Sequence, residues 1–135
     1  PVVQADIDEG LSELPEKCFD YVILSMTLQV VKKPALILKE ITRIGKKCIV
    51  SFPNFGHWRV RTQLLLKGIS PVTENLPYTW YDSPNRHFLT LKDFRNLCKS
   101  LGIKILKEIP LTKNGETKIL PNLFSEEVLY LIANG

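Results

Sequence analysis

The side chains best suited to chemistry gather in one short stretch, S-F-P-N-F-G-H-W-R, which runs from Ser51 to Arg59. It brings together a hydroxyl, a carboxamide, an imidazole and a guanidinium, all of which can bind polar ligands. Ser51 and His57 could be posed as a nucleophile and its base. The chain, however, has no G-x-S-x-G elbow and no recognisable oxyanion loop. We therefore treat Asn54, His57 and Arg59 as candidates for contacting a substrate or a partner.

The residues before this turn predict the strand that positions it. Cys48 to Phe52 form a short β-favouring run, too short for a helix and apolar enough to be buried on both faces. Pro53 should end the strand, so that Ser51 to Gly56 form a loop at its carboxyl end. Ligands of open α/β sheets bind at that end of the strands.

A second group of polar residues lies near the start of the chain. Val2 to Ala5 read as a strand, and Asp6, Asp8 and Glu9 follow directly. One interpretation is a solvated turn that caps a short helix over Leu11 to Leu14. The other is a carboxylate that accepts hydrogen bonds from a ligand amine or hydroxyl.

The next elements predict a strand, helix, strand unit with a right-handed crossover. Phe19 to Leu24 is an apolar strand of a parallel sheet, and Pro34 begins a helix with one apolar stripe that ends at Gly45. After the turn, Trp58 to Lys67 predict a helix that ends at Gly68. We expect Leu64, Leu65 and Leu66 to supply its apolar contacts.

The second half predicts one helix and an antiparallel pair of strands. A capping box at Thr90 and Asp93 opens a helix that ends at Gly102. Ile103 to Leu111 and Glu126 to Ile132 read as strands, and the short connection between them, with its Asn114-Gly115 turn, favours antiparallel pairing. The fold class is therefore α/β, with a mostly parallel sheet and a carboxyl-terminal antiparallel pair.

The aromatic residues divide into two groups. Trp58 starts a helix directly after a buried strand, so we expect it to anchor the core. Trp80 and Tyr81 lie between Pro77 and Pro84 in a long irregular segment, Ile69 to Arg86, and should be partly exposed. Exposed aromatic residues of this kind often dominate interface energies.

Composition limits the other function classes. With 135 residues, 44% of them hydrophobic, the chain can fill one core. The net charge of +4 is scattered, which disfavours nucleic acid, and no apolar run reaches membrane-spanning length. The three cysteines, Cys18, Cys48 and Cys98, read as reduced core thiols of a cytosolic protein. The two histidines lack metal-ligand spacing, and no two glycines are close enough for G-x-G-x-x-G or a P-loop.

Three stretches carry a resemblance to a known family: residues 4–11, residues 19–29 and, above all, residues 51–61 with the S-F-P-N-F-G-H-W-R run. The later L-P-Y-T-W-Y-D-S-P-N segment and His87 agree with it. Through these the sequence resembles the methionine biosynthesis protein MetW family. That family is similar to class I S-adenosylmethionine-dependent methyltransferases, with a Rossmann-like sheet, and is linked to homoserine O-acetyltransferase.

The resemblance implies roles for particular residues. Asp6 and Ile7 match the acidic loop that approaches the cofactor's adenine, and Ser25 and Leu28 match the strand-exit loop of the cofactor pocket. It also implies that the chain is the carboxyl-terminal part of a single methyltransferase-like domain, without the family's first strands and glycine-rich loop. We therefore expect weak or no binding of S-adenosylmethionine by this chain alone. An uncovered edge at Phe19 to Leu24 would also favour self-association.

Two classes of function stay open at this point. The first is a methyltransferase-like enzyme domain. The second is a non-catalytic module on the same scaffold that binds homoserine O-acetyltransferase through Trp80, Tyr81 and the turn residues Asn54, His57 and Arg59.

Overall fold

The computed structural model describes residues 4–135. Its elements, in chain order, are η1 (Ile7–Glu9), β1 (Phe19–Ser25), α1 (Pro34–Ile44), β2 (Gly45–Pro53), α2 (Trp58–Thr62), η2 (Gln63–Lys67), α3 (Leu91–Leu101), β3 (Ile103–Thr112), β4 (Gly115–Glu116), α4 (Pro121–Phe124) and β5 (Glu127–Asn134). Each long helix and strand predicted from Phe19 onward is present, with ends shifted by at most three residues; the largest shift is at β2, which begins at Gly45 and not at Cys48.

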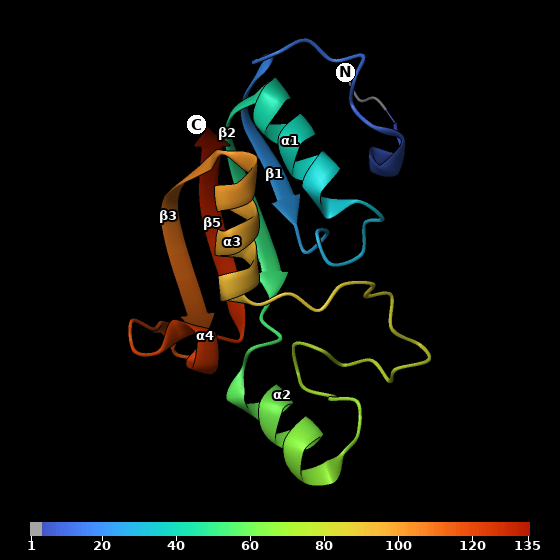
Figure 1. Cartoon of the computed structure of the whole chain (residues 1–135), viewed down its shortest axis with the longest axis vertical. Coiled ribbons are helices and arrows are strands. Elements are labelled where there is room, and N and C mark those ends of the chain that lie inside the picture. Colours follow the sequence, from blue (N-terminus) through green and yellow to red (C-terminus); the bar gives the residue numbers. More distant parts are fainter. Residues whose placement is uncertain (1–3) are drawn as a thin grey trace.

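The strands form one mixed sheet with the order β1-β2-β5-β3-β4 (Figure 1). β1 runs parallel to β2, with Ile23 opposite Ile49, which confirms the predicted parallel pair. β5 runs antiparallel to β3, which confirms the predicted carboxyl-terminal pair. The antiparallel part reaches further than expected, because β5 lies between β3 and β2 and also pairs antiparallel with β2.

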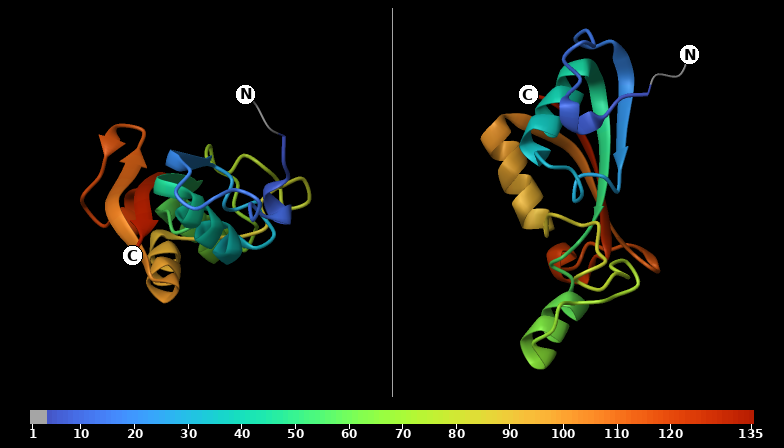
Figure 2. Two further views of the ribbon diagram at one scale, coloured as in Figure 1. Left: turned by 90° about the horizontal axis from the view of Figure 1, so that it is seen from above. Right: turned by 90° about the vertical axis from the view of Figure 1, so that its right-hand side faces the viewer.

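Two helices, α1 and α3, cover the same face of this sheet, and no helix of residues 4–135 covers the other face (Figure 2). The core lies between these helices and the alternate strand residues that point toward them. On β5 these are Val128, Tyr130 and Ile132, all fully buried. On β1, by contrast, Tyr21 and Ile23 point away from the helices and are exposed.

α1 shows how the sequence builds this layer. Pro34 occupies its first turn, where a missing N–H costs nothing, and Ile37, Leu38 and Ile41 are buried against the sheet. α1 ends at Ile44 and β2 begins at the next residue, Gly45, with no loop between them. A Cβ at Gly45 would lie 2.7 Å from Val22 Cγ2, so this glycine is required for space and not for a left-handed backbone.

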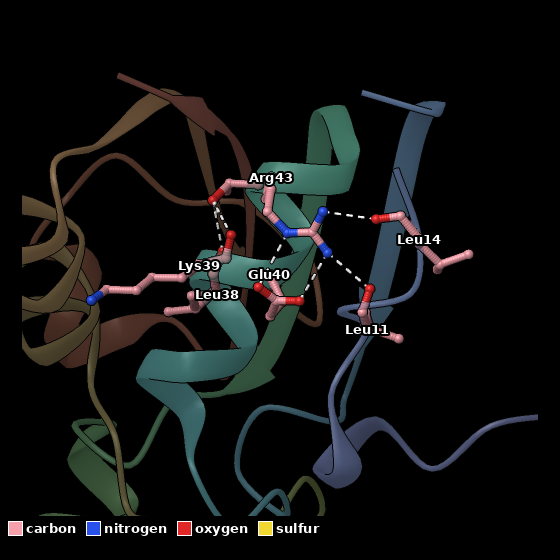
Figure 3. A network of polar contacts seen from close by, with 7 residues as sticks. Leu11, Leu14, Leu38, Lys39, Glu40 and Arg43 are labelled. Carbon is pink, nitrogen blue, oxygen red and sulfur yellow. Dashed lines mark hydrogen bonds and ion pairs between the residues drawn. The ribbon is translucent and has the colours of Figure 1, made fainter. Parts of the chain in front are cut away.

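The amino-terminal segment lies against α1 through one arginine (Figure 3). The Arg43 guanidinium donates to the carbonyls of Leu14 at 2.7 Å and Leu11 at 2.8 Å, and it pairs with Glu40 on its own helix. Five N–H groups in a planar fork allow one side chain to make all these bonds. Hydrogen bonds to Arg43 thus fix a segment that has little regular structure of its own.

Two predictions about this region were wrong, and a third can be tested only in part. Leu11 to Leu14 form a turn and no helix; the short helix is η1, a 3-10 turn that begins after Asp6. The predicted strand over residues 2–5 lies partly outside the described residues, and Gln4 and Ala5 are not in a strand. Cys18 is exposed, whereas the other two cysteines are buried as predicted.

The predicted loop at Ser51 to Gly56 also begins later than expected. Ser51, Phe52 and Pro53 are the last residues of β2 and pair with Leu129, Val128 and Glu127 of β5. Pro53 is tolerated because it is the final rung of the ladder. The loop proper is therefore Asn54 to His57, which we call the turn.

Candidate functional site

The turn is held in place by the side chain of its first residue. Asn54 is 1% exposed, and its Nδ2 donates to the carbonyls of Asn122 at 3.0 Å and Ser125 at 2.9 Å. Its Oδ1 accepts from the Gly56 backbone N–H at 2.9 Å. The carboxamide is thus committed to internal hydrogen bonds. Asn54 positions the turn and does not present a free group to a partner.

α4 packs closely against the same turn. A Cβ at Gly56 would lie 2.8 Å from the Asn122 carbonyl oxygen, so the approach requires glycine. Asn122 Oδ1 in turn accepts from the backbone N–H of Leu91, at the start of α3. The turn, α4 and the first residue of α3 therefore form one rigid junction at the carboxyl end of β2.

His57 and Arg59 lie where the turn passes into α2. His57 is buried, and its Nδ1 accepts from the Arg59 backbone N–H at 3.2 Å as the N-cap of α2. Burial lowers the pKa of His57; Glu126 opposes this shift and Arg59 adds to it. Because its pKa is lowered from the ordinary 6.5, His57 is neutral at neutral pH. The Arg59 guanidinium lies 5.4 Å from the ring centre of Trp58, as a cation–π contact.

A narrow pocket lies between these two residues and the long irregular segment. Its lining includes His57, Arg59, Glu74 and Glu126, and its volume of about 10 Å³ has room for roughly one water molecule. An imidazole and two carboxylates belong to this lining. In this conformation the pocket can bind a water or a single donor group only.

The irregular segment carries a second pocket, lined mainly by aromatic side chains. Phe55, Tyr78, Trp80 and Phe88 line it, and its volume is about 70 Å³. Trp80 and Tyr81 pack edge to face at 5.5 Å, yet they are 76% and 68% exposed. The expected exposure of these two aromatic residues is confirmed. We call Phe55, Tyr78, Trp80, Tyr81 and Phe88 the aromatic patch.

Two expectations about α2 and η2 were wrong. Trp58 is 42% exposed and so is no core anchor, because the helix that it begins leaves the sheet. Leu64, Leu65 and Leu66 are 60%, 81% and 78% exposed and make no core contact. Sequence reasoning therefore missed their place on the surface. The available signal was the spacing: three consecutive leucines cannot share one face of a helix.

The residues predicted to contact a cofactor lie at the carboxyl end of β1 and beside it. Asp6 accepts from the Asp8 backbone N–H as the cap of η1, and Ile7 packs against the core. Ser25 ends β1 and lies 3.3 Å from the hydroxyl of Ser51, whereas Leu28 is fully buried. Only Asp6 and Ser25 thus offer polar atoms to a ligand.

η1 is tied by a hydrogen bond to the β1 exit loop, residues 26–33. Asp8 Oδ1 accepts from the Lys32 backbone N–H at 2.9 Å. The same exit loop holds the end of the irregular segment, because the Gln29 carbonyl accepts from the backbone N–H groups of Arg86 and His87. Gln29 was not predicted, and its buried Oε1 has no hydrogen-bond partner among the described residues. A lone glutamine in a mostly apolar loop gave no sequence signal for this position.

Catalytic groups of the usual kinds are not assembled here. The hydroxyl of Ser51 contacts Ser25 and the Met26 backbone N–H, whereas the His57 ring accepts from the Arg59 backbone N–H. Residues 4–135 contain no group of three His, Cys, Asp or Glu side chains that could hold a metal ion. Over the same residues, no helix combines the length and apolarity needed to cross a membrane.

Comparison with known sequences points to one family. The model of the family described as methionine biosynthesis protein MetW matches residues 1–132. A curated relative, the bifunctional methionine biosynthesis protein MetXA/MetW of Rhodopirellula baltica, is 37% identical over 109 residues. The match covers 80% of this chain and 18% of that protein, so the chain spans less than a fifth of the relative's length.

Comparison with solved structures agrees on the fold. A methyltransferase dependent on S-adenosylmethionine from Thermotoga maritima, described as a possible histamine N-methyltransferase, superposes with a TM-score of 0.60 at 20% identity. A second from Archaeoglobus fulgidus gives 0.63 at 13% identity. The alignments cover 95% and 96% of this chain, and 61% and 66% of those chains. The chain therefore has an α/β fold like that of class I methyltransferases.

Proposed function

Because this chain belongs to the MetW family of methionine biosynthesis proteins, we propose that it acts beside homoserine O-acetyltransferase by binding that enzyme through its aromatic patch. The observation that carries the proposal is the exposure of Trp80 and Tyr81 next to an apolar pocket. Tryptophan and tyrosine in such a setting are typical anchors of protein interfaces. The patch is built on a segment that is joined to the β1 exit loop by hydrogen bonds from residues 86 and 87.

The fused relative supports an association of this kind. Its name describes one bifunctional polypeptide that combines MetXA and MetW. Fusion holds two units at a high effective concentration, which favours contacts that separate chains would make in a complex. We therefore propose that the unfused chain reaches the same partner by non-covalent binding.

A methyltransferase activity is the second candidate, favoured by the likeness to methyltransferase structures. The described residues fit S-adenosylmethionine poorly, because Leu28 is buried and the Ser25 hydroxyl already contacts Ser51. Asp6 uses one of its two carboxylate oxygens, Oδ1, to cap η1. These residues offer at most one side of a cofactor site, so no catalytic step follows from them.

The test is a binding titration of this chain against purified homoserine O-acetyltransferase, followed by the acetyltransferase rate with and without the chain. The proposal expects saturable binding with a dissociation constant in the micromolar range or tighter, of the kind that an interface of ordinary size gives. A chain that stays folded and shows no binding would contradict it. Methyl transfer in the absence of any partner would favour the second candidate instead.

A further inference from the structure

The aromatic patch contains a pocket whose lining carries no charged side chain. Phe55 comes from the turn, whereas Tyr78, Trp80 and Phe88 come from the long loop between η2 and α3 (Figure 1). The remaining lining residues are neutral as well, namely Ser70, Pro71, Leu76, Ser83 and Asn85. Four aromatic side chains from two segments of the chain therefore meet around one small space, which we call the aromatic pocket.

The walls of the aromatic pocket are held in place by backbone hydrogen bonds. The Phe55 N–H donates to the Leu89 carbonyl at 3.2 Å, which joins the turn to the end of the loop. Thr73 and Leu76 exchange two backbone bonds, of 3.0 and 3.2 Å. The ring centres of Phe55 and Phe88 lie 4.7 Å apart and their planes are tilted by 52°, so these rings form two adjoining walls. A pocket of fixed shape loses little conformational freedom when a ligand binds.

The size of the aromatic pocket limits its ligand to one compact group. Its volume is about 70 Å³, roughly half of the 150 Å³ of an apolar cavity that holds benzene. Such a volume suits a head group of about four non-hydrogen atoms. Trp80 and Phe88 are exposed, so the group can enter from solvent while the rest of the ligand stays outside.

The charge of the loop favours a cation. Residues 69–85 contain Glu74 and Asp82 and no lysine, arginine or histidine, although the whole chain has a net charge of +4. Glu74 pairs with Lys113, whereas Asp82 accepts from the Thr79 hydroxyl at 3.3 Å. In the part of the chain that the structure describes, no cationic side chain forms an ion pair with Asp82. The segment that supplies most of the aromatic pocket thus keeps a negative charge.

Aromatic walls within a negative segment select one chemical class. The face of an aromatic ring attracts cations, and several rings together recognise quaternary ammonium groups. A quaternary ammonium has no N–H group, so it needs no hydrogen-bond acceptor from the walls. A primary ammonium, by contrast, is strongly hydrated and would lose those water contacts on entry. A neutral apolar group would fit by size but would gain nothing from the charge of the loop.

We infer that the aromatic pocket binds the trimethylammonium head of a small molecule. The rings of Phe55, Tyr78, Trp80 and Phe88 contact its methyl groups, and the Asp82 carboxylate attracts its charge from a distance. This inference goes beyond the proposed function and does not depend on it, because homoserine O-acetyltransferase takes no part in the binding. Its failure would leave the proposed partner unaffected.

The experiment titrates the unmodified chain with choline and, separately, with dimethylbutanol, the uncharged isostere in which carbon replaces the quaternary nitrogen. Sodium chloride keeps the ionic strength equal, and calorimetry measures both affinities. We expect choline to bind with a dissociation constant in the millimolar range or tighter, and the isostere to bind at least about tenfold more weakly. Equal affinities would show a pocket that selects only for apolar groups and would overturn the inference. So would the absence of saturable choline binding at tens of millimolar.

Variants of the two tryptophans of the chain locate the site. Trp80→Leu keeps an apolar wall but removes an aromatic ring, so it should bind choline about tenfold more weakly. The matched control is Trp58→Leu, which removes a tryptophan outside the lining and should bind choline like the unmodified chain. This control leaves Trp80 as the one remaining tryptophan, and its fluorescence should change as choline binds. Unchanged choline binding in Trp80→Leu would overturn the assignment of the pocket.

Two further measurements test the charge and the source of the ligand. Asp82→Asn should weaken choline binding, more so at low salt, and an unchanged affinity would contradict the role of Asp82. Tighter binding of a peptide that carries trimethyllysine than of choline would overturn the choice of a small molecule and assign the pocket to a protein side chain. Circular dichroism shows whether each variant is folded. The comparison of choline with its isostere uses the unmodified chain and so decides the matter even if a variant unfolds.

Discussion

Asn54 and Ser125 are 71 positions apart in the sequence, yet the Asn54 carboxamide donates to the Ser125 carbonyl at 2.9 Å. Asn54 Nδ2 also lies 3.3 Å from the Ser125 hydroxyl, and Ser125 is itself fully buried. This pair joins the end of β2 to the residue that follows α4. The candidate site thus depends on a buried amide that never reaches its surface.

Replacement of this amide should damage the fold. We expect Asn54→Ala to lower the free energy of unfolding by about 2 kcal/mol, since two carbonyls and one N–H lose their partner. Asn54→Asp should cost more, because it points a carboxylate oxygen at the two carbonyls. Urea denaturation of the three forms measures this order. A harmless Asn54→Asp would show that the carboxamide is not what fixes the turn.

His57 should make the chain sensitive to mild acid. Because burial lowers its pKa below the ordinary 6.5, the unfolded chain binds more protons than the folded chain just below that pH. The stability that neutral His57 contributes is therefore present above pH 6.5 and is lost as the pH falls through the folded pKa. Melting temperatures between pH 7 and pH 5 should drop less in His57→Asn, which keeps a capping side chain.

A second variant, at Glu126, should increase the loss of stability in acid. The Glu126 carboxylate raises the pKa of His57 and partly offsets burial. Glu126→Gln should therefore steepen the acid loss over the same range. Equal pH profiles for all three proteins would mean that His57 does not titrate differently in the folded chain.

Substitution of either tryptophan should change stability only modestly, whereas their effects on binding should differ clearly. Trp80→Ala removes a side chain that is 76% exposed, so the free energy of unfolding should change by no more than about 0.5 kcal/mol. Under the proposed function it should weaken binding to the acetyltransferase by about 2 kcal/mol, roughly thirtyfold. Trp58→Ala should cost about 1 kcal/mol of stability, because Trp58 is only half-buried and holds Arg59 by a cation–π contact. Thermal melts and binding isotherms on both variants test these two roles. Early unfolding of Trp80→Ala with full binding would contradict the binding role that we assign to Trp80.

S-adenosylmethionine should bind this chain weakly or not at all. The Ser25 hydroxyl contacts Ser51, one carboxylate oxygen of Asp6 caps η1, and this sequence contains no glycine-rich loop to donate backbone N–H groups. Calorimetric titration of the chain, with an active methyltransferase as the positive control, tests this. A micromolar or tighter constant would refute it.

Copies of the chain should associate through β1. This strand is an edge of the sheet, and Tyr21 and Ile23 project from the face without helices. Exposed apolar edge strands invite pairing with further strands. Sedimentation velocity over a concentration series should show oligomers that Tyr21→Lys/Ile23→Lys disperses. A strictly monomeric profile at high concentration counts against this prediction.

The sequence was enough to predict the helices whose ends and buried face are set by residues within the helix itself. The capping box of Thr90 and Asp93 and the left-handed Gly102 set both ends of α3, and the apolar stripe and Pro34 set α1. The leucines of η2 show the limit of such signals. Because these leucines are apolar, burying them would be favourable. Whether another helix or strand lies close enough to bury them depends on the tertiary fold.

The position of the turn was predictable, whereas the roles of its residues were less so. The strand that ends at Pro53 correctly located the turn, because the carboxyl ends of strands gather polar residues. The role of Asn54 was out of reach, since its partners come from residues 122 and 125. Likewise, nothing near Gln29 in the sequence revealed that its carbonyl holds residues 86 and 87.

The direct passage from α1 into β2 at Gly45 sets where this chain tolerates a change of length. With no loop between Ile44 and Gly45, a residue inserted there has nowhere to bulge and would shift β2 by one position. Such a slip would turn Cys48, Val50 and Phe52 from the core to the open face of the sheet. Residues 69–90 contain no helix or strand and could absorb the same insertion. The fold should therefore tolerate an insertion in that segment, away from the aromatic patch, and not at the junction of α1 and β2.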